Sequence, residues 1–273
     1  MPLALNRIVF QLTKSINMLR EKDKKLIEQL DLKYPCIAIR FALARPECEH
    51  YEGEKLAFCQ YVKHAQDSGK HFYISADDDA CYGKLALGMA PIQPVTASGE
   101  AGKDFGVYKQ QLPNMLLYKD LPLLPAGTVR FVEFAPAVNC SFQPDLLFFV
   151  ADIPEADIIM RATTYISGDL WESVSSPVMS CTWMYAYPLV SKKVNHITTG
   201  LYHGLKRRKA YPAGLRMISI PYNKFPEFFQ ALEEMDKTLI AFREDEESKA
   251  QLAACVKRWN ELAEEIGSHV DLK

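Results

Sequence analysis

Cysteine is the residue type in this 273-residue chain whose side chains are best suited to chemistry. The seven are Cys36, Cys48, Cys59, Cys81, Cys140, Cys181 and Cys255. Their number is odd, the chain is long enough to bury a core, and residues 1–20 lack the clean apolar segment of a secretory signal. We therefore predict a cytoplasmic protein whose thiols stay reduced or bind metal, rather than a disulfide scaffold.

Cys81 has the sequence context of a metal ligand or a reactive thiol. Gly83 allows a close approach of the backbone, and the small residues that follow suggest a helix over residues 85–90. A cysteine at the N-terminal end of that helix would have a lowered pKa and would favour the thiolate. Cys36, Cys140 and Cys255 are instead predicted as core residues, because free cysteine often behaves as a small buried hydrophobe.

The other candidate motifs are weaker. Cys48 and His50 are spaced to share a metal from one loop, but no second such pair lies nearby. Residues 77–79 are three acids that suit either a hard cation or a turn. The basic run 206–209 suits either a phosphate or a solvated face. Dinucleotide, P-loop, zinc-protease and Cys-x-x-Cys motifs are absent from the sequence.

The composition is that of a folded globular protein. Hydrophobic residues make up 48% and aromatic residues 11%, which excludes a disordered chain. A net charge of −2 lacks the basic footprint of a nucleic-acid-binding protein. No stretch approaches about 20 unbroken apolar residues, so we expect no membrane-spanning helix. A small-molecule ligand and a second copy of the chain remain as candidate partners.

Hydrophobic periodicity predicts one α+β domain: a mixed sheet with flanking helices and a C-terminal helical hairpin. The predicted helices cover residues 16–30, 54–67 and 154–165, and the predicted strands cover 36–43, 71–75, 128–134, 145–151, 181–187 and 215–220. Residues 91–106 are rich in Pro and Gly and indicate a loop or short turns. No linker marks a boundary, so we treat residues 1–273 as a single domain with its core over about 34–222.

Residues 224–266 have a different pattern from the core. Apolar residues recur at three- and four-residue steps over 224–242 and again over 251–266, with an acidic turn between them. This predicts a helical hairpin or a single long helix. Such helices would dock onto the sheet or onto a dimer partner, and we expect a homodimer through them.

A wider set of residues carries a family resemblance. The set comprises residues 58–69 with Cys59, residues 81–88 with Cys81 and Gly83, Pro144-Asp145 before an apolar strand, Pro154 before a helix, Cys181 with Ala186 and Pro188, and Ile220-Pro221 before the last helices. Together these positions resemble the ArCR family (domain of unknown function 169), over about residues 36–239. The resemblance implies a cytoplasmic prokaryotic protein and carries no established reaction.

The resemblance also implies a set of sulfur ligands at Cys59, Cys81 and Cys181. Many members have a fourth cysteine in a Gly-Cys-x-Gly-x-Arg segment. The matching residues 200–207 of this chain contain Tyr202 and His203 and no cysteine. The fourth position is therefore a variant ligand, a vacant coordination position or a lost site.

Two hypotheses follow. In the first, the three thiolates hold a metal or an iron–sulfur cluster with a redox role, and Gly83, Tyr202 and His203 contact the cofactor. Soft thiolates select iron–sulfur clusters, zinc or copper(I). In the second, the protein is a metal-free binding module or enzyme. Its pocket would combine the aromatic residues 171–187 with Arg161 and the basic run, and would take an anionic ligand.

Overall fold

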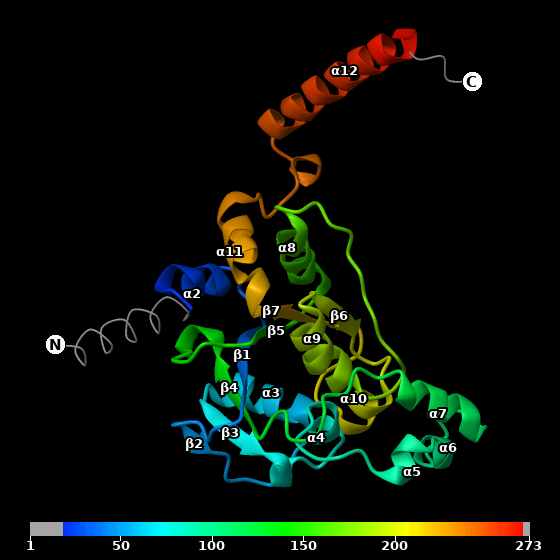
Figure 1. The fold of residues 1–273 in the computed structure, drawn as a ribbon. Helices are drawn as coiled ribbons and strands as arrows, with labels where there is room; N and C mark the ends of the chain where they lie inside the picture. Colours follow the sequence, from blue (N-terminus) through cyan, green and yellow to red (C-terminus); the bar gives the residue numbers. More distant parts are fainter. Residues whose placement is uncertain (1–18, 270–273) are drawn as a thin grey trace, which may run out of the picture. The chain divides into compact units, whose positions relative to one another are not determined.

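The structure is a computed structural model that describes residues 19–269 and contains a seven-stranded mixed sheet (Figure 1). The strand order is β2-β3-β4-β1-β5-β7-β6, and all neighbours are antiparallel except β2 and β3. The strands are β1 Tyr34–Ala42, β2 Glu49–His50, β3 Phe72–Ser75, β4 Phe131–Pro136, β5 Leu146–Ala151, β6 Asn195–Thr198 and β7 Arg216–Pro221. The predicted α+β class with a mixed sheet is confirmed.

Helices flank the sheet and fill the long connections between its strands. They are α2 Glu21–Glu28, α3 Phe58–Ser68, α4 Gly83–Ala86, α5 Pro94–Ala97, α6 Glu100–Asp104, α7 Gln111–Lys119, α8 Ile153–Thr164, α9 Tyr187–Ser191, α10 His203–Arg208, α11 Phe225–Glu234 and α12 Glu246–His269. Short helices α5 and α6 occupy most of the segment predicted as a loop or short turns. Of the helix predicted over 16–30, residues 16–18 lie outside the described residues.

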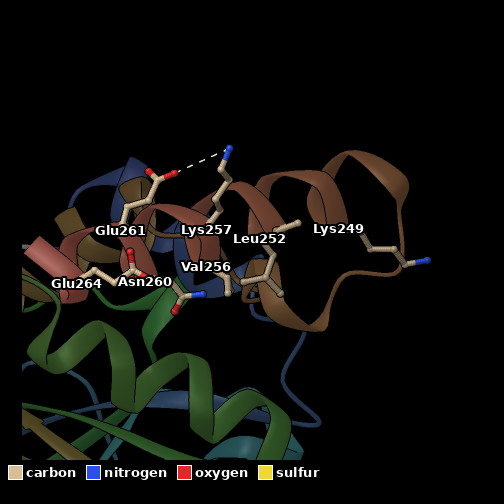
Figure 2. Close-up of a pocket in the computed structure, with 8 residues that line it drawn as sticks. Lys249, Leu252, Val256, Lys257, Asn260, Glu261 and Glu264 are labelled. Atoms are coloured by element: carbon tan, nitrogen blue, oxygen red, sulfur yellow. Dashed lines mark ion pairs between the residues drawn. The ribbon is translucent and has the colours of Figure 1, made fainter.

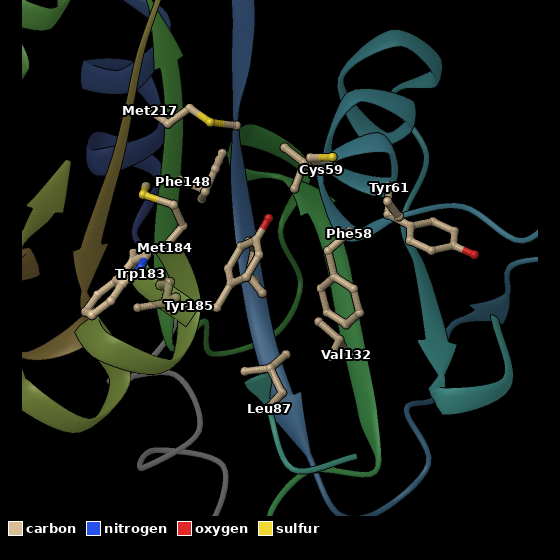
Figure 3. Close-up of a cluster of buried hydrophobic side chains, with 14 of the residues drawn as sticks. Phe58, Cys59, Tyr61, Leu87, Val132, Phe148, Trp183, Met184, Tyr185 and Met217 are labelled. Atoms are coloured by element: carbon tan, nitrogen blue, oxygen red, sulfur yellow. The ribbon is translucent and has the colours of Figure 1, made fainter. Parts of the chain in front are cut away.

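The two faces of the sheet carry different side chains because successive strand residues point to opposite sides. One side, which we call face A, includes Ile39, Phe134 and Phe148 and packs against α3 and the segment before α9. The other side, face B, includes Phe149, which meets Phe228 of α11. Figure 3 shows part of the face A cluster, in which Cys59 and Tyr185 lie among aromatic and aliphatic side chains.

The predicted strand over residues 181–187 is wrong. Thr182–Ala186 forms a π-helical turn, and α9 continues from it. All five residues of the turn are buried. A helix that is apolar all round has no polar face to set a period, so its sequence cannot be distinguished from a buried strand. The aromatic content of this segment then favoured the strand.

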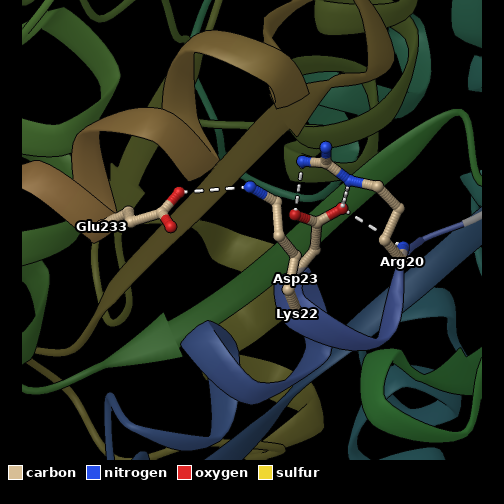
Figure 4. Close-up of polar contacts among 4 residues, drawn as sticks. All are labelled: Arg20, Lys22, Asp23 and Glu233. Atoms are coloured by element: carbon tan, nitrogen blue, oxygen red, sulfur yellow. Dashed lines mark hydrogen bonds and ion pairs between the residues drawn. The ribbon is translucent and has the colours of Figure 1, made fainter.

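The first described helix, α2, is held by charged contacts at its start and along its side (Figure 4). Arg20 pairs with the buried Asp23 through Nε–Oδ2 and Nη2–Oδ1 contacts of 2.7 Å each. The Arg20 backbone N–H also donates to Asp23. Lys22 reaches Glu233 of α11, with 3.2 Å between Nζ and Oε2.

Residues 234–273 form a compact unit separate from residues 1–233. The long helix of this unit, α12, exposes a row of large apolar residues that includes Trp259, Leu262 and Ile266. The depression drawn in Figure 2 is lined by residues of α12 alone, so it is the side of one helix rather than an enclosed pocket. The predicted hairpin between α11 and α12 stays a prediction. Within residues 19–269, no helix is both long and apolar enough to cross a membrane.

Candidate functional site

Two of the three family-like cysteines line one cavity on the face A side of the sheet. The cavity has a volume of about 240 Å³ and lies between the segment before α4, the α6–α7 region, the segment before the π-helical turn, and α10. Of the predicted site residues, Cys81, Gly83, Cys181 and His203 all line it. Its walls also include apolar side chains, among them Phe105 and Val178. The structure thus brings together residues from three distant parts of the chain.

Asp79 fixes the backbone around Cys81. Its buried carboxylate accepts hydrogen bonds from the backbone N–H of Cys81 at 3.0 Å and from that of Lys84 at 2.8 Å, and thereby caps the start of α4. Burial raises the pKa of Asp79. Neighbouring Asp78 is also used locally, because it accepts from the backbone N–H of Ser75. Two of the three acids, Asp78 and Asp79, therefore position backbone, as expected for a turn.

Gly83 allows a close approach of the Phe58 side chain. A Cβ atom added at Gly83 would lie 2.1 Å from Cδ2 of Phe58. Phe58 is the first residue of α3 and is fully buried. Since Cys59 follows Phe58, this contact places the Cys81 segment against the start of α3, where Cys59 lies.

Cys59 and Cys181 are held in a strongly desolvated environment. Burial, followed by the charge of Cys81, raises the pKa of Cys59 to about 12. Burial also raises the pKa of Cys181 well above its usual range, with further contributions from Cys59, Cys81 and Asp79. The three thiols therefore lie within electrostatic reach of one another. Among the described residues, however, the three thiols do not form a group in which all sulfur atoms lie within 4.8 Å of one another.

Backbone donors face two of these sulfur atoms. The N–H of Gln60, in the first turn of α3, favours the thiolate of Cys59 and opposes the effect of burial on its pKa. The N–H of Cys181 acts in the same direction on its own sulfur. Cys181 itself immediately precedes the π-helical turn, a feature often found at functional sites.

Helix α10 closes another side of the cavity. His203 begins this helix, and Arg207 and Arg208 at its end also line the cavity. The guanidinium of Arg208 donates from Nη2 to the carbonyl of Ala80 at 2.6 Å, which ties α10 to the Cys81 segment. Tyr202 is placed differently: it is buried beside α10 and its hydroxyl pairs with Ser175. Tyr202 is not among the residues that line the cavity.

The residues of the predicted aromatic and basic pocket are dispersed. Arg161 pairs with Asp157 on α8, with 2.9 Å between Nε and Oδ2. Trp171 lines a different depression, together with Glu172 and Lys193 among others. Only the arginines of the basic run reach the cavity of Cys81. Cys48 and His50 were considered as ligands of one metal, but His50 pairs instead with Asp78, with 2.9 Å between Nε2 and Oδ2.

The residues that line the cavity fall within a stretch of the chain that matches a known family model. The model described as Uncharacterised ArCR matches residues 25–231, well over half of the chain. This chain belongs to the ArCR family. An uncharacterised protein of the archaeon Methanocaldococcus jannaschii is 24% identical to it over 224 residues, which cover 80% of this chain and 95% of the relative. No solved structure matches.

The ArCR resemblance indicated four residues that line the cavity, Cys81, Gly83, Cys181 and His203, but sequence reasoning did not give the roles of three other residues near it. Asp79 was grouped with its acidic neighbours, because it lies four residues before α4 and outside the N-cap position, which Tyr82 occupies. Tyr185 was assigned to a strand. Burial together with Cys181 and Cys59 raises its pKa well above the usual range, so its hydroxyl lies near those thiols. No pattern in the sequence predicts the hydrogen bond from Arg208 to the carbonyl of Ala80.

Proposed function

We propose that this ArCR protein holds an iron–sulfur cluster, or another soft metal centre with a redox role, through the thiolates of Cys59, Cys81 and Cys181. The observation that carries the proposal is the grouping of these thiols: Cys81 and Cys181 line one cavity, and Cys59 at the start of α3 lies within electrostatic reach of both. Soft thiolates are the ligands that such centres select.

The spacing of the sulfur atoms favours a cluster over a single ion. Ligands of one zinc ion crowd around a common point, whereas the cysteines of a cluster bind different iron atoms and stand farther apart. The cavity also offers room beside Cys81 and Cys181, and His203 is available as a nitrogen ligand. Positive iron would stabilise the thiolates that burial otherwise disfavours. Reduced thiols are required, so we assign the protein to the cytoplasm.

A second candidate function rests on Arg207 and Arg208. Two guanidinium groups beside an apolar wall suit an anionic small molecule, with or without a metal. If the cluster is present, this ligand would occupy the side of the cavity that α10 forms. If it is absent, the cavity is a binding pocket for the anion alone.

The test is purification of the full chain without oxygen, followed by an absorption spectrum and by iron and acid-labile sulfide analysis. We expect iron and sulfide together, and we expect Cys81→Ser to lose at least half of both. The matched control is Cys255→Ser, because Cys255 lies on α12 in the separate unit. Protein without iron or sulfide, or Cys81→Ser with the full content of both, contradicts the cluster.

A further inference from the structure

Three metal-ligating side chains of different type meet on face B of the sheet. Cys48, His71 and Glu133 each offer one ligand atom, and these atoms all lie within 4.8 Å of one another. Cys48 immediately precedes β2 and His71 immediately precedes β3, and these two strands pair in parallel. Glu133 lies on β4, opposite Tyr73 of β3. The strand register therefore places all three on one side, opposite to the side that packs against α3.

The carboxylate of Glu133 is buried and has a basic partner on each oxygen. It is 2% exposed, and its Oε1 lies 2.6 Å from Nε2 of His71. Its Oε2 lies 2.5 Å from Nη2 of Arg40 in an ion pair, yet no donor among the described residues is aligned on this oxygen as a hydrogen bond. Arg40 and His71 therefore each hold one oxygen of this buried carboxylate, which fixes Oε1 beside the His71 ring.

The thiol of Cys48 lies beside this carboxylate, because its sulfur is within 4.8 Å of the ligand atoms of both Glu133 and His71. A divalent ion would compensate both negative groups at once, while Arg40 stays paired with the far oxygen of Glu133 and orients it.

We propose that Cys48, His71 and Glu133 bind one zinc ion. Sulfur, imidazole nitrogen and carboxylate oxygen are the three ligand types that zinc takes, whereas calcium and magnesium require oxygen ligands. On binding, Zn–S, Zn–N and Zn–O bonds replace bonds from zinc to water. The S–H bond of Cys48 breaks and its proton leaves to solvent, and His71 binds through Nε2 as the neutral tautomer with its proton on Nδ1. The His71–Glu133 separation has to widen from 2.6 Å to about 3.3 Å for tetrahedral coordination.

Three protein ligands leave one coordination position open. These residues line a cavity of about 780 Å³ that also contains Arg40, Arg45 and Phe142. An open fourth position facing a cavity is the arrangement of zinc sites that hold a water molecule or a substrate. The proposal is independent of the thiols on face A, because none of Cys59, Cys81 and Cys181 belongs to this group.

The test uses cobalt(II) as a spectroscopic substitute for zinc in the full chain, after removal of metals and without oxygen. We expect one equivalent of cobalt with a tetrahedral spectrum and a sulfur-to-cobalt charge-transfer band, and one equivalent of zinc displaces it. Cys48→Ser should lose that band, and His71→Gln should weaken binding at least tenfold. Cys81→Ser, which removes a ligand of the face A centre, should keep the band.

Cys48 lies in a loop and is only half-buried, so its replacement by serine leaves the fold intact, as a circular dichroism spectrum checks. Three results overturn the zinc site. One is a wild-type protein that takes up no cobalt. Another is a tetrahedral spectrum that Cys48→Ser and His71→Gln leave unchanged. Loss of the band in Cys81→Ser alone assigns the cobalt to the face A thiols and also overturns it.

Discussion

The ring of Phe58 occupies the space where a side chain at Gly83 would begin. A Cβ at Gly83 would lie 2.1 Å from Cδ2 of Phe58, closer than real Cβ contacts allow. The start of α3 and the segment of Cys81 are therefore fitted to each other at a glycine. The sequence predicted that the backbone at Gly83 is closely approached. The structure shows that the ring of Phe58 takes the place of a side chain there.

We expect Gly83→Ala to destabilise the protein by about 1–3 kcal/mol, because the fully buried ring of Phe58 has little room to move. Thermal unfolding of the two proteins measures the effect. The matched control is Gly204→Ala in α10, where nothing lies within 4 Å of the added Cβ. An alanine there should be neutral or stabilising. Equal melting temperatures for wild type and Gly83→Ala would refute the close fit.

Stability should fall at alkaline pH, in part through Cys59. Its pKa is raised from 9.0 to about 12 in the folded protein, so between these values the unfolded chain releases the proton and the folded chain keeps it. Unfolding is therefore favoured as pH rises above 9, by about 1.4 kcal/mol for each pH unit from this thiol. Urea unfolding of metal-free protein at pH 8, 9 and 10 measures the slope.

In that series, Cys59→Ala should show a smaller loss of stability with pH than the wild type. Cys255→Ala on α12 is the control and should keep the wild-type slope. Parallel curves for wild type and Cys59→Ala would mean that Cys59 ionises equally in both states. The comparison uses slopes, so the cavity that alanine leaves in the core does not affect it.

The arginines of α10 can be tested with inorganic phosphate as the anionic probe. Arg208 lines the cavity and bonds to Ala80, whereas Lys206 of the same helix does not line it. We expect Arg208→Gln to weaken phosphate binding about tenfold and Lys206→Gln to change it less than twofold. Isothermal titration calorimetry gives both values. Equal affinities would place phosphate outside the cavity.

Self-association through the C-terminal helices remains a prediction that α12 makes more specific. Its apolar residues follow three- and four-residue steps typical of a coiled-coil seam: Leu252, Cys255, Trp259, Leu262 and Ile266. In an antiparallel pair, Arg258 of one copy would flank the seam beside Glu265 of the other. This charge match favours a second copy of the chain as the occupant.

We expect Trp259→Glu to shift the full chain from dimer to monomer in sedimentation experiments, because Trp259 is at the centre of the seam. Lys257→Glu, on the opposite side of the helix, should leave the dimer intact. A wild-type protein that is monomeric at all concentrations would disprove the seam. Truncation at Lys224 is unsuitable as a test, because it removes Phe228 and Phe229 of α11 from the core.

The elements predicted with most success are apolar strands inside the sheet and a helix with proline in its first turn. The strands near 36–43, 145–151 and 215–220 and the helix near 154–165 match β1, β5, β7 and α8 to within three residues at each end. Strands β2 and β6, at the two edges of the sheet, were missed because both are short and neither is an apolar run. The buried π-helical turn failed because it has no polar face.

The candidate site divides in the same way. Family resemblance indicated Cys59, Cys81 and Cys181, since it compares positions without needing their distances. The group of Cys48, His71 and Glu133 was not found, because its members meet only through the pairing of β2 with β3 and of β3 with β4. The register between strands depends on the whole sheet, so residues that meet through it show no motif of fixed spacing in the sequence.

The π-helical turn after Cys181 carries one residue more than an α-helical turn would need. Each residue of a helix rotates the direction of the next side chain by about 100°. If α9 keeps its place, deletion of a single residue within Thr182–Ala186 would therefore rotate the Cys181 side chain away from the cavity. A substitution in the turn does not change the number of residues and so would not restore the direction. The length of this segment, more than the identity of its side chains, sets the direction in which the Cys181 sulfur points.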